Sequence, residues 1–327
     1  MKADTIDSMR SLGIFRKNKF NEIWQRYYLL ILVGAVIAIS SVLHDAFLTK
    51  ENIMNVLASN AMTAMVALGM FFVILTGGID LSVGSIIALS CCLLAGFLQQ
   101  GFHWFFSILF TLIIMCFPGV VSGVLITRGQ IPPFMATLSM MTIVRGLAYM
   151  YQVGSPRLIF DKTVLFIGTG EIGWIPMPVL ILIVVFIVCA FVLGRTIFGR
   201  RLYAIGGNAL ASFLSGVLVK RYILFVYIIS SFISALAGVV LGARLMMGAA
   251  IFGQGYELDA IASVIIGGAS MNGGSGTALN TVLGAFVFGF ISNILNLVGV
   301  TSYMQMVIKG IIIFTAVLVS RRGLLTS

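Results

Sequence analysis

The fold of this chain is decided by a polar interruption between two long apolar segments, Thr76-Gly77-Gly78-Ile79-Asp80-Leu81-Ser82-Val83-Gly84. Glycine and aspartate suit a lipid-facing helix poorly, because freed backbone groups and a carboxylate find no partners in hydrocarbon. Such an interruption is tolerated where it packs against protein or lines a cavity. We therefore expect a broken helix here, with Gly77, Gly78, Asp80 and Ser82 as candidate pathway residues. We also expect Asp80 to cap the helix that follows.

The composition places the rest of the chain in the membrane as well. The 327 residues are 60% hydrophobic and 9% charged, whereas a soluble domain carries about 25% charged residues. The apolar segments run for about 16–24 residues without alternating in period two, which favours helices over a barrel. We predict an all-α polytopic membrane protein of about ten transmembrane helices, some of them broken or short. The predicted spans are 27–43, 53–75, 80–98, 104–127, 130–151, 175–194, 222–243, 257–271, 277–298 and 302–320.

The distribution of Lys and Arg predicts the orientation of these spans. If the N-terminus is inside, fourteen of the twenty basic residues fall in interior segments and four in exterior ones, with Arg145 and Lys309 within spans. This bias favours an even number of spans with both termini cytoplasmic. Because the basic residues are explained as topology signals, the net charge of +10 does not call for a nucleic-acid partner.

The same topology predicts the domain organisation. We expect a cytoplasmic N-terminal tail at 1–26, retained rather than cleaved as a signal peptide. A single transmembrane domain at 27–321 follows, with a long cytoplasmic loop at about 195–221. The directions of the spans would suit an inverted-topology repeat, although we see no convincing repeat at the level of residues.

The sequence lacks the residue patterns that metal binding, redox chemistry and nucleotide binding require. The four cysteines, all in apolar segments, form no C-x-x-C pair, so zinc and redox sites are not expected. There is no Walker motif, and the G-x-G-x-x-G match at 168–173 follows no predicted strand. We therefore expect neither an enzyme nor a bound cofactor or metal.

The predicted cytoplasmic loop contains a short amphipathic pattern. Gly206 and Gly207 can break a preceding helix, Asn208 is a good N-cap, and Gly216 can help to end the new helix. An apolar stripe then follows at i, i+3, i+4 and i+7, formed by Leu210, Phe213, Leu214 and Val217. Such a stripe must be buried against lipid, against its own domain or against a partner.

A third polar island at 253–259 is followed, after one short span, by a glycine-rich segment at 267–276, and the two carry further candidates for the pathway, Glu257, Asp259 and Asn272. Their many glycines are also compatible with a plain interhelical turn. Lys309 lies within the last span, where we expect it to snorkel to the surface rather than to pair with Glu257 or Asp259.

Four segments resemble those of one transporter family in order and spacing: T-G-G-I-D-L-S-V-G-S (76–85), Y-A-I-G-G-N (203–208), G-Y-E-L-D-A-I-A (255–262) and I-G-G-A-S-M-N-G-G (266–274). They resemble the ribose-type ABC importer permeases of bacterial inner membranes. The resemblance implies a homodimer or heterodimer of such subunits in membrane lipid, two cytoplasmic ATPase subunits and a periplasmic sugar-binding protein. It also implies a role in contacting the ATPase for Gly206, Gly207, Asn208, Leu210, Phe213, Leu214 and Gly216. One departure is Phe213-Leu214-Ser215, where relatives often carry a basic residue.

We therefore interpret the chain as the permease subunit of an ATP-driven monosaccharide importer. The alternative is a self-sufficient, ion-coupled secondary transporter, which would also use broken helices. That alternative needs a relay of buried ionisable groups, for which the available residues are Asp80, Arg145, Glu257, Asp259 and Lys309. An intramembrane enzyme would need a nucleophile, a base or a metal cluster, and the sequence suggests none.

Overall fold

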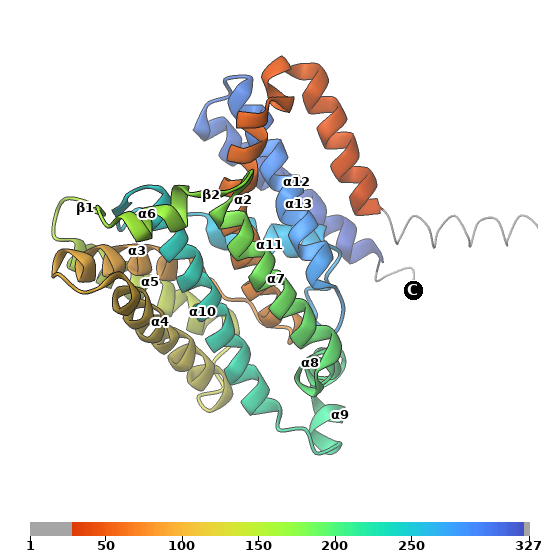
Figure 1. The fold of residues 1–327 in the computed structure, drawn as a ribbon. Helices are drawn as coiled ribbons and strands as arrows, with labels where there is room; N and C mark the ends of the chain where they lie inside the picture. Colours follow the sequence, from red (N-terminus) through yellow and green to blue (C-terminus); the bar gives the residue numbers. More distant parts are fainter. Residues whose placement is uncertain (1–27, 324–327) are drawn as a thin grey trace, which may run out of the picture.

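A computed structural model describes residues 28–323, and it is built almost entirely of helices (Figure 1). A helix lies at each of the ten predicted spans, so the all-α fold is confirmed. These helices are Tyr28–Leu43, α2 (Lys50–Leu75), α3 (Val83–Gln99), α4 (Trp104–Thr127), α5 (Pro133–Gln152), α7 (Met177–Arg195), α10 (Val219–Arg244), α11 (Tyr256–Ile266), α12 (Ala278–Leu297) and α13 (Ser302–Gly323). The predicted tail at 1–26 lies outside the described residues.

The lengths of the helices do not by themselves give ten crossings. Within residues 28–323, five helices are long and apolar enough to cross a membrane, namely α2, α4, α7, α10 and α12. The helix Tyr28–Leu43, α3 and the segment Ser302–Thr315 of α13 are apolar but shorter. With 11 residues, α11 is only about 16 Å long, about half of the hydrocarbon thickness. The chain is thus a polytopic membrane protein, and the count of ten spans stays a prediction.

The long helix α10 lies at the centre of the packing and contacts α2, α3 and α4 along its length. Small residues on its neighbours allow the close approach that membrane helices favour. A methyl group on Gly119 of α4 would lie 2.5 Å from the backbone oxygen of Tyr227. A methyl group on Gly69 of α2 would lie 3.3 Å from the Cα atom of Ser230. The centre of the bundle is therefore held together by contacts between backbones as well as by apolar side chains.

The interruption after α2 is built from a regular helix-ending motif. The N–H of Gly77 donates to the carbonyl of Ile74 at 2.9 Å, and the N–H of Gly78 donates to that of Val73 at 3.1 Å. This pair of bonds is a Schellman motif, and it requires the left-handed φ of +76° that Gly77 adopts. The chain then runs without helix until α3 begins at Val83, so the predicted broken helix is confirmed.

The helix α11 ends in the same way. Gly268 has a φ of +79°, and its N–H donates to the carbonyl of Ile265 at 2.8 Å. The N–H of Ala269 donates to the carbonyl of Val264 at 3.2 Å, which completes a second Schellman motif. Two interrupted helices in different thirds of the chain therefore stop with the same local geometry. The inverted-topology repeat itself stays a prediction.

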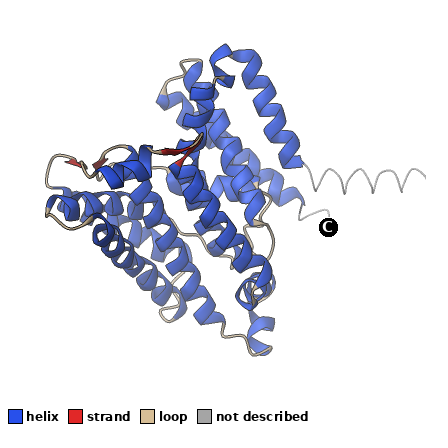
Figure 2. Cartoon of the chain, viewed as in Figure 1, coloured by secondary structure: helices blue, strands red, loops and turns tan. Residues whose placement is uncertain are grey.

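One end of the molecule carries short elements of secondary structure between α5 and α7 and beside the end of α10. It contains the short helix α6 (Lys162–Thr169) and two antiparallel strand pairs, β1 (Arg157–Leu158) with β4 (Met247–Gly248) and β2 (Glu171–Ile172) with β3 (Ile175–Pro176) (Figure 2). The 3-10 helix η1 (Asp45–Leu48) precedes α2. Gly168, the first glycine of the G-x-G-x-x-G match, packs against α10, where a methyl group would lie 2.1 Å from the backbone nitrogen of Arg244.

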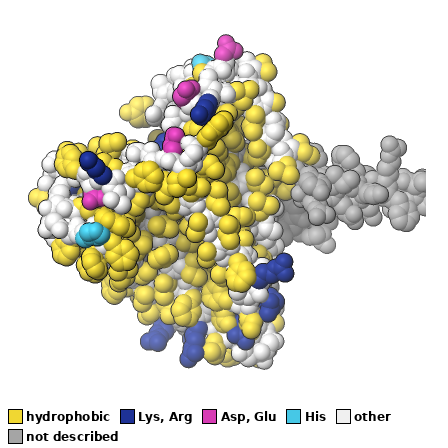
Figure 3. Space-filling model, viewed as in Figure 1, with side chains coloured by type: hydrophobic (Ala, Val, Ile, Leu, Met, Phe, Trp, Pro, Cys, Tyr) yellow, Lys and Arg dark blue, Asp and Glu magenta, His cyan; other side chains and the backbone are white. Residues whose placement is uncertain are grey.

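The predicted cytoplasmic loop at 195–221 contains two helices, α8 (Ile197–Gly207) and α9 (Ala209–Leu214). The helix α8 ends at Gly207, directly before Asn208, so the preceding helix ends at the glycine pair as expected. The break falls at Asn208, whose φ of −160° is extended. Figure 3 shows basic side chains gathered at the end of the molecule that carries α8 and α9, beyond a broad apolar belt.

Candidate functional site

Asp80 lies in the interruption between α2 and α3 and is 1% exposed. Its Oδ1 accepts hydrogen bonds from the backbone N–H of Ser82 at 3.0 Å and from the Ser82 hydroxyl at 2.6 Å. Its Oδ2 accepts a hydrogen bond from the hydroxyl of Ser230, on α10, at 2.8 Å. The carboxylate thus fixes Ser82, the N-cap residue of α3, rather than the first turn of the helix itself. It also ties the broken segment to the central helix.

Sequence reasoning missed the polar face of α10 that meets Asp80. Ser230 and Tyr227 are three residues apart, so they lie on one side of that helix. The Tyr227 hydroxyl points at Gly78, where a methyl group would lie only 2.4 Å from it. Among the described residues, this buried hydroxyl has no hydrogen-bond partner. The signal that could have revealed this face is the run of serines at 230, 231 and 234 in an otherwise apolar helix.

Arg145 is a second functional candidate without a predicted role. Its guanidinium on α5 donates to the carbonyl of Ala250 at 2.6 Å and to that of Phe252 at 2.7 Å. These carbonyls belong to the non-helical segment between β4 and α11. Backbone that lacks helical hydrogen bonds is stable in a membrane only where protein groups satisfy it. Arg145 therefore satisfies backbone carbonyls in the non-helical segment before α11. Its place inside a predicted span was the available signal.

The acidic residues of the third island lie in the first turn of α11, where negative charge is favoured by the helix dipole. Glu257 accepts a hydrogen bond from the N–H of Gly255 at 3.3 Å and sits beside Gly84 of α3, where a methyl group would lie 2.3 Å from its Oε2. Asp259 forms an ion pair with Lys309, with 2.9 Å between Nζ and Oδ2. The expectation that Lys309 snorkels is therefore wrong, because the packing of α13 against α11 brings a carboxylate within reach.

Three of the four sequence motifs meet at one backbone junction. The N–H of Gly274 donates to the carbonyl of Leu75, at the end of α2, at 3.0 Å. A methyl group on Gly206 of α8 would lie 1.9 Å from that same carbonyl oxygen and 2.3 Å from the Gly274 nitrogen. One on Gly77 would lie 3.3 Å from the carbonyl oxygen of Asn272. The structure thus brings together Gly77, Gly206 and Asn272 among the predicted site residues, whereas the acidic residues lie at the opposite end of α11.

The short helix α9 has the ends that the sequence predicts. The Asn208 side chain accepts a hydrogen bond from the N–H of Ala211 at 2.9 Å, which confirms it as the N-cap. Gly216 has a φ of +83°, and its N–H donates to the carbonyl of Phe213 at 2.9 Å. The N–H of Val217 donates to the carbonyl of Ser212 at 3.0 Å, so the helix ends in a third Schellman motif.

The apolar stripe of α9 is open in this chain. Leu210 is 68% exposed, Phe213 64% and Leu214 76%, whereas Ser212 on the other side is buried. Burial of the stripe against its own domain is thereby contradicted. Figure 1 places α9 at the tip of the molecule, beyond α8 and the start of α10.

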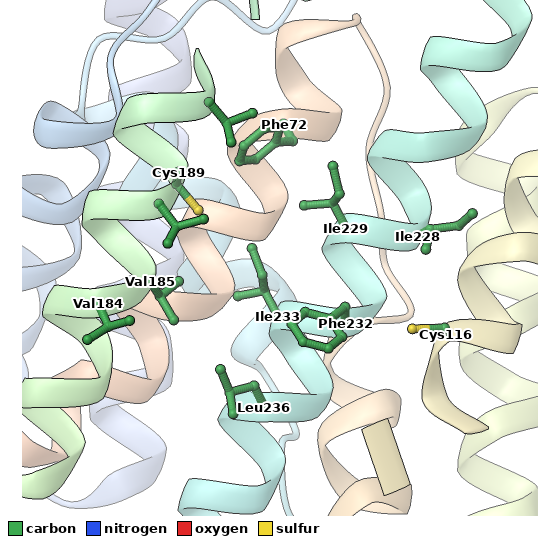
Figure 4. Close-up of a pocket in the computed structure, with 12 residues that line it drawn as sticks. Phe72, Cys116, Val184, Val185, Cys189, Ile228, Ile229, Phe232, Ile233 and Leu236 are labelled. Carbon is green, nitrogen blue, oxygen red and sulfur yellow. The ribbon is translucent and has the colours of Figure 1, made fainter. Parts of the chain in front are cut away.

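A cavity of about 470 Å³ lies between α2, α4, α7 and α10 (Figure 4). Its lining is apolar, as the close-up shows with Phe72, Phe232 and Leu236, and its only heteroatoms in side chains are the sulfurs of Cys116 and Cys189. A hydroxylated solute would lose its hydrogen bonds to water here without replacement. This cavity suits hydrocarbon and is a poor site for a polar substrate.

Interrupted helices, an apolar belt and an open amphipathic helix at one tip define a class, the polytopic subunits of membrane transport systems. Residues 52–317 match the family described as branched-chain amino acid transport system / permease component, and the chain belongs to this family.

The curated relatives cover nearly the whole chain. The chain is 41% identical over 305 residues to the ribose import permease protein RbsC of Bacillus subtilis (strain 168), which covers 93% of this chain and 95% of that protein. It is 36% identical to the D-allose transport system permease protein AlsC of Escherichia coli (strain K12), over 91% of this chain and 92% of the relative. It is 32% identical to the L-arabinose transport system permease protein AraH of the same strain, over 92% of each. No solved structure matches the chain.

Proposed function

We propose that this chain is the membrane-spanning permease subunit of a binding-protein-dependent ABC importer that carries a monosaccharide. The observation that carries the proposal is the likeness to the ribose permease over 93% of this chain and 95% of the relative. A likeness of this extent includes the interrupted helices and the α8–α9 tip as well as the apolar spans. The chain is a transporter subunit rather than an enzyme, and ATP is hydrolysed on a separate ATPase subunit.

The relatives favour a sugar over an amino acid as the substrate. The family description names branched-chain amino acids, but the relatives described above are named for ribose, allose and arabinose. These three substrates share several hydroxyl groups and differ in the number of carbon atoms or in stereochemistry. A monosaccharide is therefore the substrate class that we assign.

We assign one partner protein to each end of the molecule. The ATPase subunit docks on α9, whose stripe is open, and the periplasmic binding protein docks at the opposite end, near α6 and the strand pairs. The tip with α8 and α9 then faces the cytoplasm, in agreement with its basic side chains (Figure 3). We further propose ten crossings, cytoplasmic termini, a location in the bacterial inner membrane and a second permease subunit as partner.

The transport step itself requires only a conformational change. The ATPase drives it by binding the inward-facing and outward-facing states with different affinity, because a ligand shifts an equilibrium only through such a difference. We place the pathway along the interrupted helices, with Gly77, Gly78, Asp80, Ser82, Glu257, Asp259 and Asn272 as its candidate residues. We assign the contact with the ATPase to Asn208, Leu210, Phe213, Leu214 and Gly216, with Gly206 and Gly207 behind them.

Reconstitution tests the proposal. The chain is placed in proteoliposomes with the ATPase and the binding protein of its own transport system, and uptake of labelled D-ribose, D-allose, L-arabinose and L-leucine is measured. We expect ATP-dependent accumulation of at least one sugar and none of leucine. Accumulation of leucine alone would contradict the substrate class. Sugar accumulation driven by an ion gradient without the ATPase would support the secondary transporter instead.

A further inference from the structure

We propose that Tyr203 and Gly206, on one face of α8, are positioning residues that transmit the movement of α9 to both interrupted helices. The inference rests on the proposed function, because it assumes that an ATPase subunit moves α9. It goes further by naming the contact through which that movement reaches the interior of the membrane domain.

The first step concerns the connection between α9 and α8. Asn208 alone separates them, and its backbone N–H donates to the carbonyl of Ala204 at 3.0 Å, within the last turn of α8. Its carbonyl accepts the N–H of Ser212 at 3.0 Å, within α9. One residue thus belongs to the hydrogen-bond ladders of both helices. A displacement of α9 is therefore passed to the end of α8 rather than absorbed in a flexible loop.

The second step concerns the face that α8 turns toward the membrane domain. Tyr203 and Gly206 are three residues apart and lie on the same side of the helix. The Tyr203 hydroxyl donates to the carbonyl of Gly276 at 2.9 Å. The backbone of Gly206 touches the carbonyl of Leu75 so closely that a methyl group there would lie 1.9 Å from the oxygen. The next residue, Gly207, has nothing within 4 Å of such a methyl group, so the contact is confined to one face.

The third step concerns what this face touches. The last carbonyls of a helix lack partners within it, and that of Leu75 accepts the N–H of Gly274 at 3.0 Å. A hydrogen bond therefore joins the end of α2 to the segment before α12, and α8 contacts both of them. The Gly274 φ of +76° and the Gly276 φ of +125° are conformations that glycine adopts without strain. A side chain at position 206 would push α8 away from the end of α2 and from the segment before α12.

The experiment compares two glycines that each gain one methyl group inside a helix near the same end of the protein. Gly206→Ala would place its methyl group against the Leu75 carbonyl, whereas Gly194→Ala on α7 has nothing within 4 Å. Each variant is reconstituted with the ATPase and the binding protein. Four quantities are measured: the Kd for the ATPase, the basal rate of ATP hydrolysis, the rate stimulated by the sugar-loaded binding protein, and sugar uptake.

We expect Gly206→Ala to lose far more of its stimulated rate than of its affinity for the ATPase, because the exposed side chains of α9 that we assign to the contact are unchanged. Its stimulated rate and its sugar uptake should fall at least tenfold, and Gly194→Ala should retain both. Tyr203→Phe removes only the bond to Gly276 and should reduce stimulation several-fold at unchanged Kd. If Gly206→Ala fails to fold, the stimulated rate of Tyr203→Phe tests the inference in its place.

Two results would overturn the inference. One is normal stimulation and uptake in Gly206→Ala or, if that variant does not fold, in Tyr203→Phe. The other is a loss of stimulation that merely follows a weaker Kd for the ATPase, since α8 would then only support α9. The proposed function fails separately, when the unsubstituted protein shows no ATP-dependent sugar uptake.

Discussion

Replacing Phe213 by alanine is expected to weaken binding of the ATPase subunit about 100-fold while leaving the membrane domain folded. The side chain lies on α9 and is 64% exposed, so its loss removes no packing within the chain. An aromatic side chain has a surface of about 200 Å², so about 130 Å² of Phe213 is free for a partner. At about 25 cal/mol per Å², burying that area contributes about 3 kcal/mol, which is about 100-fold in Kd.

The assay is a titration of the purified ATPase against the permease in lipid nanodiscs, with the Kd as the result. Phe191→Ala is the matched control, because Phe191 is 61% exposed but lies on the apolar helix α7. We expect this control to bind the ATPase with the Kd of the unsubstituted protein. The reasoning is refuted if Phe213→Ala binds within threefold of that Kd, or if Phe191→Ala weakens binding equally. The first result would mean that the ATPase does not bury the stripe of α9, and the second that the loss is not specific to α9.

Four further perturbations test the polar groups of the membrane domain by uptake and by thermal unfolding in nanodiscs. Asp80→Leu removes the acceptor of three hydrogen bonds and should abolish uptake, whereas Asp80→Asn keeps an acceptor and should retain part of it; full uptake by the leucine variant would show that the carboxylate has no role. Ser230→Ala removes one bond to a charged group and should cost about 1.5–3 kcal/mol in stability, unless a water replaces it and the melting temperature is unchanged. Lys309→Glu and Asp259→Lys should each destabilise the protein, and the double variant should recover most of the loss; lack of recovery would mean that the ion pair contributes nothing. Arg145→Met leaves two loop carbonyls unpaired and should cost about 2–6 kcal/mol, so an unchanged melting temperature would exclude its role in holding that loop.

The sequence predicted the helices well because their signals are local. Long apolar segments, the glycine pair after α2, and the cap and end of α9 at Asn208 and Gly216 each depend on neighbouring residues alone. The period of the α9 stripe was visible in the same way, but the sequence left open whether lipid, the chain itself or a partner covers it. Local hydrogen bonding and period are sufficient for such features.

The contacts between distant segments were not predictable in this way. Gly206 lies in the last turn of α8, where the sequence predicts a helix end, but its close approach to the carbonyl of Leu75 was not predictable. The pairing of Lys309 with Asp259 depends on how α13 packs against α11, which no spacing in the sequence reveals. The role of Ser230 likewise needs the position of Asp80 on another element. What was missing in each case is tertiary packing, which overrides local preference.

The bond from Arg145 to the loop before α11 has a consequence for how the protein is made. Its acceptor Ala250 lies 105 residues later in the chain, which a ribosome reaches roughly 5–20 s after it has made α5. Until then a guanidinium at that depth lacks its carbonyl partners and is costly to keep within hydrocarbon. α5 is not among the five helices apolar enough to be candidate spans, so little holds it in place alone. We expect α5 to reach its final position in the bilayer only once the chain has been synthesised as far as Phe252.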